Sequence, residues 1–358
     1  MKLLIITQAV DKRNPVLGFF HGWIEEIAKH FSFVTVICLE KGKFDLPNNV
    51  RVLSLGKEAN SMEYSVLSRR YRVYRKIKYA FNFYKFIWQE RKNYDAVFVH
   101  MNQEYVILGW KLWLILSKRI YMWRNHHEGN LITDLASLFC RRIFCTSKYS
   151  YTAKFKKTVL MPIGVDSAIF HTISHMERVP NSILFLGRMA PVKRPDLLIE
   201  VLRDLEDSGV AFSATLIGDP KDEDINYYES LKSSVNVSNI SSRVKFEKAI
   251  QHDQTVEAYN KHQIFVNLSS SGMYDKTIIE AMMCGAIVLV SNKNLVGEIS
   301  DKCIFEEGNR SELKEKLATL LALSEVEVES LRLELKNFAL KHSLHLLGNR
   351  LSQVINND

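Results

Sequence analysis

The chain has 358 residues, of which 47% are hydrophobic and 25% charged, and its formal net charge is +8. This composition is typical of a globular protein with two domains of ordinary size. Its five scattered cysteines contain no CxxC pair, which disfavours a disulfide framework and a structural zinc site and favours a reducing compartment.

The first half of the chain alternates short apolar runs with amphipathic patterns such as Phe20–His30. The run at the N-terminus has no small-residue cleavage site, so we interpret it as a strand and not as a signal peptide. Apolar runs alternating with helices predict a parallel sheet covered on both faces. The strands are expected at Leu3–Thr7, Val34–Leu39, Val50–Leu55, Ala96–His100, Arg119–Trp123, Ile143–Thr146 and Thr158–Met161.

Residues 69–92 form an unusually basic segment. Nine of them are Lys or Arg and Glu90 is the only acid, while aromatic residues such as Tyr74, Phe81 and Trp88 lie between the cations. As a helix, Arg69–Lys92 would fit an anionic membrane surface, where basic and aromatic residues combine. Two other interpretations stay open: a solvated helix whose aromatics pack on the sheet, and a segment that binds nucleic acid.

The second half repeats the alternation, with strands expected at Ser182–Leu186, Ser213–Ile217, Val244–Glu247, Ile264–Asn267 and Ile287–Val290. We therefore expect two doubly wound α/β domains, residues 1–168 and 169–340, with ligands beyond the carboxyl ends of the strands. A final helix over 341–358 is expected to pack back on the first domain. Residues 1–170 hold 27 Lys+Arg against 13 Asp+Glu, and the remainder holds 21 against 27, so the two halves are expected to face different partners.

Two segments of the second half have the chemistry of a diphosphate site. After the strand that ends at Leu186, Gly187 permits close backbone approach, and Arg188 and Lys193 supply two cations beside a helix start. The bland interpretation of this turn is a loop with two solvated cations. In the other segment, residues 269–277, backbone amides and the Thr277 hydroxyl precede a helix and could hold phosphate oxygens.

Glu280 follows in the first turns of that same helix, where its carboxylate is suited to the vicinal hydroxyls of a ribose. The alternative is a Glu that only favours the helix dipole. Gly285 then ends the helix before the next strand.

These segments resemble those of retaining glycosyltransferases of family 4, which have the GT-B fold of two Rossmann-like domains facing a cleft. Gly187, Arg188 and Lys193 match the Gly-Arg and Lys of that family, and Glu280 begins its Glu-Ala-Met element. Two further elements follow the family's order, Pro162–Phe170 and Leu216–Asp219. The resemblance is firm over residues 160–310 and loose before them.

The resemblance implies contacts in the first half as well. Gly18, after the first strand, would match a glycine-rich loop near the donor phosphates, although it also suits an ordinary turn before a helix. His126 would lie near the reacting sugar and orient it, with His127 close behind. From their place after the Ala96–Val99 run, His100 and Glu104 are candidates for the acceptor side, although ordinary loop polarity explains them at least as well.

One position departs from the family: its first carboxylate, close to the donor sugar, is replaced here by Gly272. Asp275 or Lys276 could supply the missing contacts. The full set of expected donor contacts is Gly18, Gly187, Arg188, Lys193, Gly272, Met273, Tyr274, Asp275, Lys276, Thr277 and Glu280, and the expected catalytic residues are His126, Arg188 and Lys193.

The sequence thus predicts a retaining glycosyltransferase of hexosyltransferase type that uses a nucleoside-diphosphate sugar, with UDP favoured over GDP. The acceptor would be a lipid-linked or polysaccharide precursor at the cytoplasmic face of the inner membrane. No metal, other cofactor or nucleic-acid partner is expected. The alternatives are another GT-B activity, such as nucleotide-sugar epimerisation or glycoside phosphorolysis, a catalytically silent subunit that binds a sugar nucleotide or membrane, and a basic nucleic-acid binder.

Overall fold

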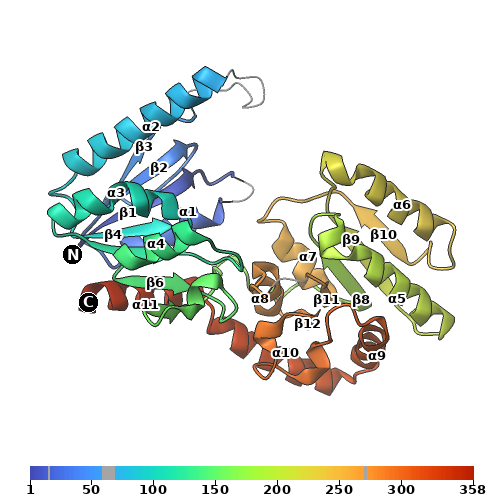
Figure 1. Ribbon diagram of the computed structural model, residues 1–358. Helices are drawn as coiled ribbons and strands as arrows, with labels where there is room; N and C mark the ends of the chain where they lie inside the picture. The colour runs from blue at the N-terminus through green and yellow to red at the C-terminus, as the bar shows by residue number, and fades with distance from the viewer. Residues whose placement is uncertain (15–16, 59–68, 270–271) are drawn as a thin grey trace. The chain divides into compact units, whose positions relative to one another are not determined.

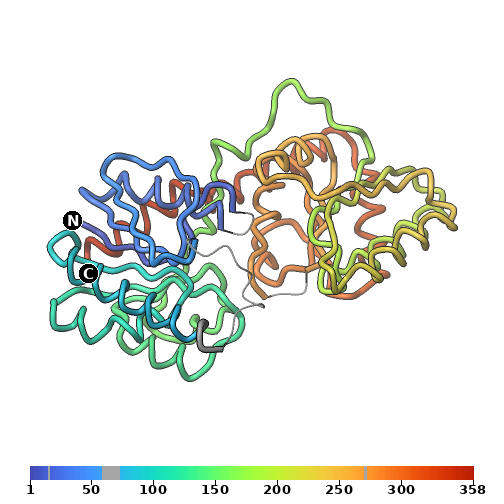
Figure 2. Tube along the Cα trace, turned by 90° about the horizontal axis from the view of Figure 1, so that it is seen from above, coloured from blue at the N-terminus to red at the C-terminus, as the bar shows by residue number. Residues whose placement is uncertain are grey.

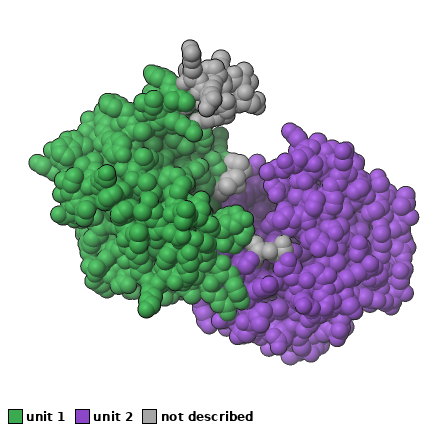
Figure 3. Space-filling view, in the orientation of Figure 1, with its two compact units in different colours: residues 1–164, 344–358 green, residues 165–343 purple. Residues whose placement is uncertain are grey.

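The computed structural model describes residues 1–14, 17–58, 69–269 and 272–358 (Figure 1). The chain divides into two compact units, coloured separately in Figure 3. Unit 1 comprises Met1–Gly164 and Leu344–Asp358, and unit 2 comprises Val165–Ser343. Each unit is built on one parallel sheet, so the expected α/β class with two doubly wound domains is confirmed.

Unit 1 contains a seven-stranded parallel sheet in the order β3-β2-β1-β4-β5-β6-β7. Neighbouring residues of β1 point to opposite faces, so Leu3 and Ile5 enter one core while Leu4 and Ile6 enter the other. The strands are β1 (Lys2–Val10), β2 (Phe33–Lys41), β3 (Val50–Ser54), β4 (Ala96–His100), β5 (Arg119–Trp123), β6 (Arg142–Cys145) and β7 (Thr158–Leu160).

Two groups of helices cover the two faces of this sheet. Helices α1 (Phe19–Ala28) and α11 (Leu344–Asn357) share one core. Helices α2 (Arg69–Gln89), α3 (Gln103–Ile115) and α4 (Leu131–Phe139) share the other. A short 3₁₀ turn, η1 (Tyr151–Lys154), lies between β6 and β7.

The last helix, α11, belongs to unit 1 although it follows all of unit 2 in sequence (Figure 2). Its residues Leu344, Leu347, Leu351 and Ile355 recur at helical spacing and are buried against α1 and the sheet. Gly164, at the end of the first part of unit 1, has φ +78°, and a Cβ there would lie 2.4 Å from Leu347. The boundary between the units falls at 164/165 and the return at 343/344, a few residues from the positions expected from the sequence.

Unit 2 contains a five-stranded parallel sheet in the order β10-β9-β8-β11-β12. Its strands are β8 (Val179–Leu186), β9 (Ser213–Ile217), β10 (Val244–Glu247), β11 (His262–Asn267) and β12 (Ile287–Val290). Its helices are α5 (Pro195–Asp207), α6 (Ile225–Asn236), α7 (Thr255–Lys261), α8 (Lys276–Met283), α9 (Arg310–Leu321) and α10 (Glu325–Leu340), with short 3₁₀ turns between them.

The strand order reverses once in each sheet, between β1 and β4 in unit 1 and between β8 and β11 in unit 2. In open α/β sheets such a reversal opens a crevice beyond the carboxyl ends of the two strands, and ligands bind there. The two segments that the sequence analysis selected follow β8 and β11 directly. The fold therefore brings them to one switch point.

Candidate functional site

The loops after β8 and β11 meet through Lys193. Its Nζ lies 2.9 Å from Oγ of Ser269 and 2.9 Å from Oδ2 of Asp275, across more than 75 residues of sequence. Lys193 ends the 3₁₀ turn η2 (Pro191–Lys193), and Arg194 behind it adopts a left-handed conformation that redirects the chain into α5. The ammonium group is held at the switch point by two partners on the neighbouring loop.

Gly187 and Arg188 lie at the open side of this edge. A Cβ added to Gly187 would meet no atom within 4 Å, and the Arg188 side chain is exposed. The adjacent Gly218 has φ +152°, and a Cβ there would lie 1.9 Å from the Gly187 carbonyl oxygen. Gly218 is thus required by close backbone packing, whereas the space at Gly187 is open and Arg188 can extend into solvent or onto a ligand.

Asp275 caps the N-terminus of α8. Its carboxylate accepts hydrogen bonds from the Thr277 backbone amide (3.3 Å) and hydroxyl (2.8 Å) and from Nδ2 of Asn267 (3.1 Å). Burial raises the pKa of Asp275, but Lys193 and these donors outweigh it and lower the pKa below its usual value. The helix-start donors expected to hold phosphate therefore already stabilise an internal anion.

The residues before Asp275 are fixed by two asparagines that follow β12. Nδ2 of Asn294 donates to the Gly272 carbonyl and Nδ2 of Asn292 donates to the Met273 carbonyl, both at 2.7 Å. Met273 is buried, and the Tyr274 hydroxyl donates to the Asn294 carbonyl at 3.3 Å. These bonds give the segment a defined conformation at the edge of the sheet.

Glu280 is 4% exposed and uses both carboxylate oxygens within the protein. Oε1 lies 3.1 Å from Nε2 of His252, and Oε2 accepts a hydrogen bond from the Tyr259 hydroxyl at 3.3 Å. The Glu280 carboxylate raises the pKa of His252, against the lowering effect of burial. A ribose at Glu280 would have to share or displace the exposed His252 ring.

Lys276, one helical turn before Glu280, begins α8. Burial lowers the pKa of its ammonium group to about 7, although the Glu280 carboxylate partly opposes that effect. The side chain is thus a weakly basic group beside the candidate ribose contact.

The first-half residues belong to unit 1. Gly18 precedes α1, and a Cβ there would lie 2.6 Å from the Asn14 carbonyl oxygen, so its own turn requires glycine. The His126 ring is partly exposed and stacks on His127 at 4.6 Å, with Nδ1 3.0 Å from the Glu128 amide. The His126 carbonyl accepts from Tyr151 N at 2.9 Å, so it already has a partner.

The two acceptor-side candidates have different environments. His100 is 3% exposed and its ring stacks on Phe20 at 3.9 Å, with Nδ1 3.4 Å from the Thr7 hydroxyl. Glu104 is exposed and lines a pocket in unit 1. His100 is thus a core residue, and Glu104 alone is available to a ligand.

Helix α2 divides its residues between two faces. Tyr79, Phe83 and Ile87 pack into the core that α2 shares with the sheet. Arg75, on the same helix, is 2% exposed. The outer face presents six large apolar or aromatic residues that are 41–67% exposed, namely Val73, Tyr74, Ile77, Phe81, Tyr84 and Trp88. Exposed Lys76, Lys78 and Lys85 lie among them. We call these nine residues the outer face of α2. The side chains of Arg69, Arg70 and Arg72, which the sequence analysis included in the basic segment, lie outside the described part of the structure.

Sequence reasoning missed several members of the unit 2 site. His252 and Tyr259 hold Glu280, and Asn267 and Ser269 hold the Lys193–Asp275 pair. The polar ends of β11 and of the segment before α7 were the available signals. No helix within the described ranges is long and apolar enough to cross a membrane. In the same ranges, no three His, Cys, Asp or Glu residues are grouped to hold a metal ion.

Residues 171–341, most of unit 2, match the family of glycosyl transferases group 1. An uncharacterized glycosyltransferase of Methanocaldococcus jannaschii is 25% identical over 202 residues, which is 55% of this chain and 54% of the relative. A D-inositol 3-phosphate glycosyltransferase of Rhodococcus opacus is 24% identical over 36% of this chain and 30% of the relative. The matches thus span about half or less of these curated relatives.

The similarity to solved structures extends over the whole chain. HepE of Anabaena, in complex with UDP, superposes with a TM-score of 0.76 at 15% identity and full coverage of both chains. A sucrose-phosphate synthase of Thermosynechococcus elongatus gives 0.72 at 14% identity, covering 100% and 99%. WaaG, described as a glycosyltransferase of lipopolysaccharide biosynthesis, gives 0.66 at 14% identity, covering 99% and 100%. These likenesses confirm the expected GT-B fold, and the family match agrees with the expected glycosyltransferase class.

Proposed function

We propose that the chain transfers a sugar from a nucleoside-diphosphate sugar to a hydroxyl acceptor, with retention at the anomeric carbon. The observation on which this rests is the convergence of the β8 and β11 loops at the switch point of unit 2, around Lys193 and the start of α8. The same region matches the glycosyl transferases group 1. A cation and a helix start at a switch point suit a diphosphate.

In this reaction the protein must stabilise the negative charge that develops on the departing diphosphate. Arg188 is exposed beside the open space at Gly187 and supplies a guanidinium to that group. Lys193 supplies the second cation, which also pairs with the Asp275 carboxylate. Glu280 would receive the ribose hydroxyls and His126 would orient the donor sugar.

A UDP-linked donor is favoured over a GDP-linked one. The neighbouring structures of HepE contain UDP, UDP with glucose, and UDP-glucose. These ligands are those of HepE, and they support the choice of UDP as the first nucleotide to test on this chain. They leave the sugar open, and the glycine at position 272 is the feature of this site that bears on it.

The acceptor in this proposal is a lipid-linked or glycan precursor, used at the cytoplasmic face of a membrane. The support comes from the outer face of α2, where exposed aromatic and aliphatic side chains alternate with three lysines. Such a face gains free energy by burying its rings at the headgroup level and by attracting anionic lipids. Unit 1 would then lie on the bilayer through α2.

One alternative has its own observations: a catalytically silent subunit that binds a sugar nucleotide. Gly272 lacks the carboxylate that the resembling family has at this position, and Lys193 is already paired with Asp275. Binding without turnover would follow if the site holds the nucleotide but cannot stabilise the reacting sugar.

A nucleotide screen tests the proposal most directly. UDP should raise the unfolding temperature of the full chain with its concentration, because ligands that bind only the folded state stabilise it by mass action. GDP and ADP at equal concentrations serve as comparisons. Release of UDP from UDP-sugars in the presence of a lipid extract then separates the enzyme from the silent subunit. Absence of any shift with all three nucleotides would refute both.

A further inference from the structure

Unit 1 contains a cavity of about 710 Å³ at the carboxyl edge of its sheet. Gln8 of β1, Leu39 of β2, Met101 after β4 and Arg124 after β5 line it, and α2 forms another wall. The strand order reverses between β1 and β4, so the cavity lies at the switch point of this unit. A volume of this size is typical of small-molecule sites.

Part of the cavity lining is apolar. It includes the partly exposed Leu39, Met101 and Leu108 and the buried Leu55 and Phe83. When a ligand covers apolar surface in such a wall, binding becomes more favourable by roughly 25 cal/mol per Å² of surface removed from water. This part of the cavity suits a hydrocarbon or another apolar group.

Arg124, which is half-buried, also lines the cavity. Burial lowers the pKa of its guanidinium, although Glu104 partly opposes that effect. Nε donates to Oε1 of Gln103 at 3.0 Å and Nη2 to the Glu128 carbonyl at 3.4 Å, and both acceptors are neutral. Among the described residues Arg124 forms no ion pair within 4.0 Å. A partly desolvated cation with neutral partners favours an anionic ligand.

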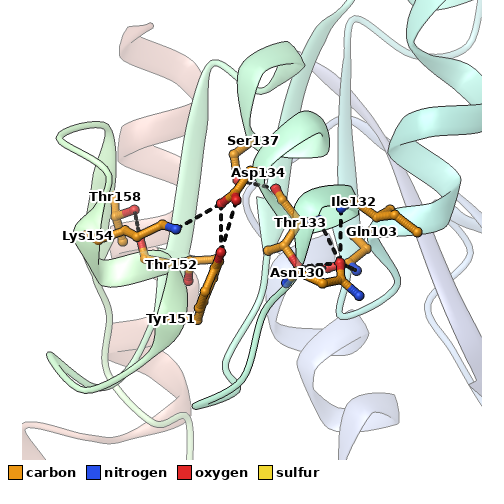
Figure 4. Close-up of polar contacts among 10 residues, drawn as sticks. All are labelled: Gln103, Asn130, Ile132, Thr133, Asp134, Ser137, Tyr151, Thr152, Lys154 and Thr158. Atoms are coloured by element: carbon orange, nitrogen blue, oxygen red, sulfur yellow. Dashed lines mark hydrogen bonds and ion pairs between the residues drawn. The ribbon is translucent and has the colours of Figure 1, made fainter.

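The Arg124 side chain is oriented by Gln103, and Figure 4 shows the contacts that Gln103 makes with Thr133 and Asn130. Oε1 of Gln103, which accepts from Arg124, also accepts from the Thr133 hydroxyl at 2.8 Å. Nε2 of Gln103 lies 3.4 Å from Oδ1 of Asn130, which caps α4. These contacts hold Gln103 on the cavity wall before any ligand binds, which reduces the entropic cost of recognition.

Two further charged groups line the cavity. Lys76, which is also counted in the outer face of α2, lines the cavity and adds a second cation. Glu104 places one carboxylate on the wall beyond ion-pair distance of Arg124. The carboxylate can accept a hydrogen bond from a hydroxyl, and it disfavours ligands with several negative charges. The geometry therefore selects a group with one anionic centre.

We infer that this cavity binds the acceptor, and that the acceptor is a small amphiphile whose apolar part lies on Leu39, Met101 and Leu108 and whose single anionic group, a phosphate or a carboxylate, pairs with Arg124. The identification of the ligand as the acceptor rests on the proposed function, but the binding site itself is inferred from residues of unit 1 alone. It adds the charge class of the substrate to the proposed transfer reaction.

Calorimetric titration of the full chain with octyl phosphate, octanoate and uncharged octyl glucoside, below their micelle concentrations, tests the inference. Octyl phosphate or octanoate should bind at least tenfold more tightly than octyl glucoside, and inorganic phosphate alone should bind weakly because it lacks the apolar part. Whichever of the two anions binds more tightly identifies the anionic group. Equal affinity for the charged and uncharged amphiphiles would overturn the inference.

Variants locate the binding. Arg124→Gln keeps hydrogen-bonding capacity toward Gln103 and should lower the affinity for the anionic amphiphile at least tenfold, whereas Arg124→Lys should retain most of it. Arg141→Gln removes the same charge from an exposed position of unit 1 and should change nothing. Ala80→Phe, which fills the cavity from α2, should lower the affinity for all the amphiphiles. Unchanged binding in both Arg124→Gln and Ala80→Phe would overturn the inference.

A UDP titration on the same samples separates this inference from the proposed function. UDP should bind Arg124→Gln as it binds the unmodified chain, because the proposed nucleotide site belongs to unit 2. Amphiphile binding without UDP binding would leave the cavity intact and refute the transferase. UDP binding without Arg124-dependent amphiphile binding would refute the inference about the cavity and leave the proposed transferase intact.

Discussion

Nζ of Lys193 lies 2.9 Å from Oδ2 of Asp275, so the cation expected to meet a donor diphosphate already has a carboxylate partner. The same carboxylate caps α8 through Thr277. A diphosphate that approaches Lys193 therefore meets a cation whose charge is partly neutralised and a helix start whose donors are partly engaged. The affinity of the site for nucleotide depends on how easily Asp275 gives up these contacts.

Asp275→Asn should strengthen the binding of UDP. The amide keeps an oxygen that can cap α8, while the repulsion between the carboxylate and the diphosphate disappears. We expect about a tenfold lower Kd, which corresponds to about 1.4 kcal/mol. Isothermal titration at two salt concentrations measures this change, and Asp222→Asn, an exposed position of unit 2, is the matched control. Unchanged or weaker UDP binding in a folded Asp275→Asn would contradict the assignment of Lys193 to the diphosphate.

Arg188→Ala should lower turnover on the order of 10²–10³-fold, the usual effect of removing one group that stabilises transition-state charge. Because the side chain is exposed, the free energy of unfolding should change by less than about 0.5 kcal/mol. Steady-state kinetics with a UDP-sugar and urea unfolding measure the two quantities. Lys261→Ala, an exposed cation at the amino end of β11, should leave both unchanged. Full activity in Arg188→Ala would exclude a role for the residue at the diphosphate.

Each of the twelve strands in the described ranges overlaps a predicted strand. Most of them are apolar runs between turn residues, and the two sheets bury such runs on both faces. The strand β10, Val-Lys-Phe-Glu, is an exception because its apolar and charged residues alternate. The partners of Lys193 and Glu280 were not predictable. Asp275 and Lys193 meet only because β8 and β11 are neighbours in the sheet, and that order is decided by packing over long sequence separations. His252 reaches Glu280 from a polar stretch whose sequence has no periodic signal.

The same limit applies to unit 1. The basic and aromatic composition of Arg69–Lys92 was visible in the sequence, but the division of its rings between the core and the outer face was not. Tyr79 and Phe83 lie inward and Phe81 and Trp88 outward, as the helical period places them relative to the sheet. His100 shows the reverse case, since a polar residue at a strand end is buried here against Phe20.

Replacing Lys76, Lys78 and Lys85 together by Gln should release the chain from anionic vesicles. Each lysine near a charged bilayer contributes about 1 kcal/mol, so the triple variant should bind on the order of 100-fold more weakly. Co-sedimentation with vesicles containing phosphatidylserine measures the partition, and added salt should weaken it for the unmodified chain. The matched control replaces Lys41, Lys43 and Lys148, three exposed lysines of unit 1. Equal partition of both triple variants would exclude attachment through α2.

The His252–Glu280 pair should make stability depend on pH. The Glu280 carboxylate raises the pKa of His252 above 6.5 in the folded chain, so the pair stabilises most fully below pH 6.5. That contribution is lost as the pH rises through the folded pKa. Lys276, which lowers this pKa, and Asp253, which raises it, also face the ring. The unfolding free energies of the unmodified chain and His252→Gln should differ at pH 5.5 and converge by pH 8.5, and a difference independent of pH would contradict the pairing.

Gly272→Glu should change which sugar the site accepts. The Gly272 carbonyl is held by Asn294, so a side chain at 272 starts from a fixed backbone position beside Met273 and Asp275. A carboxylate there would add acceptors for sugar hydroxyls, and a site that hydrogen-bonds a hydroxyl discriminates strongly against donors that lack it. We expect the kcat/KM ratio between two UDP-hexoses that differ at one hydroxyl to shift about tenfold. Gly272→Gln, which has the same shape without the charge, is the control. If the ranking of donors is the same in all three proteins, position 272 does not contact the sugar, and the donor choice of this chain must be sought among the other residues of the loop.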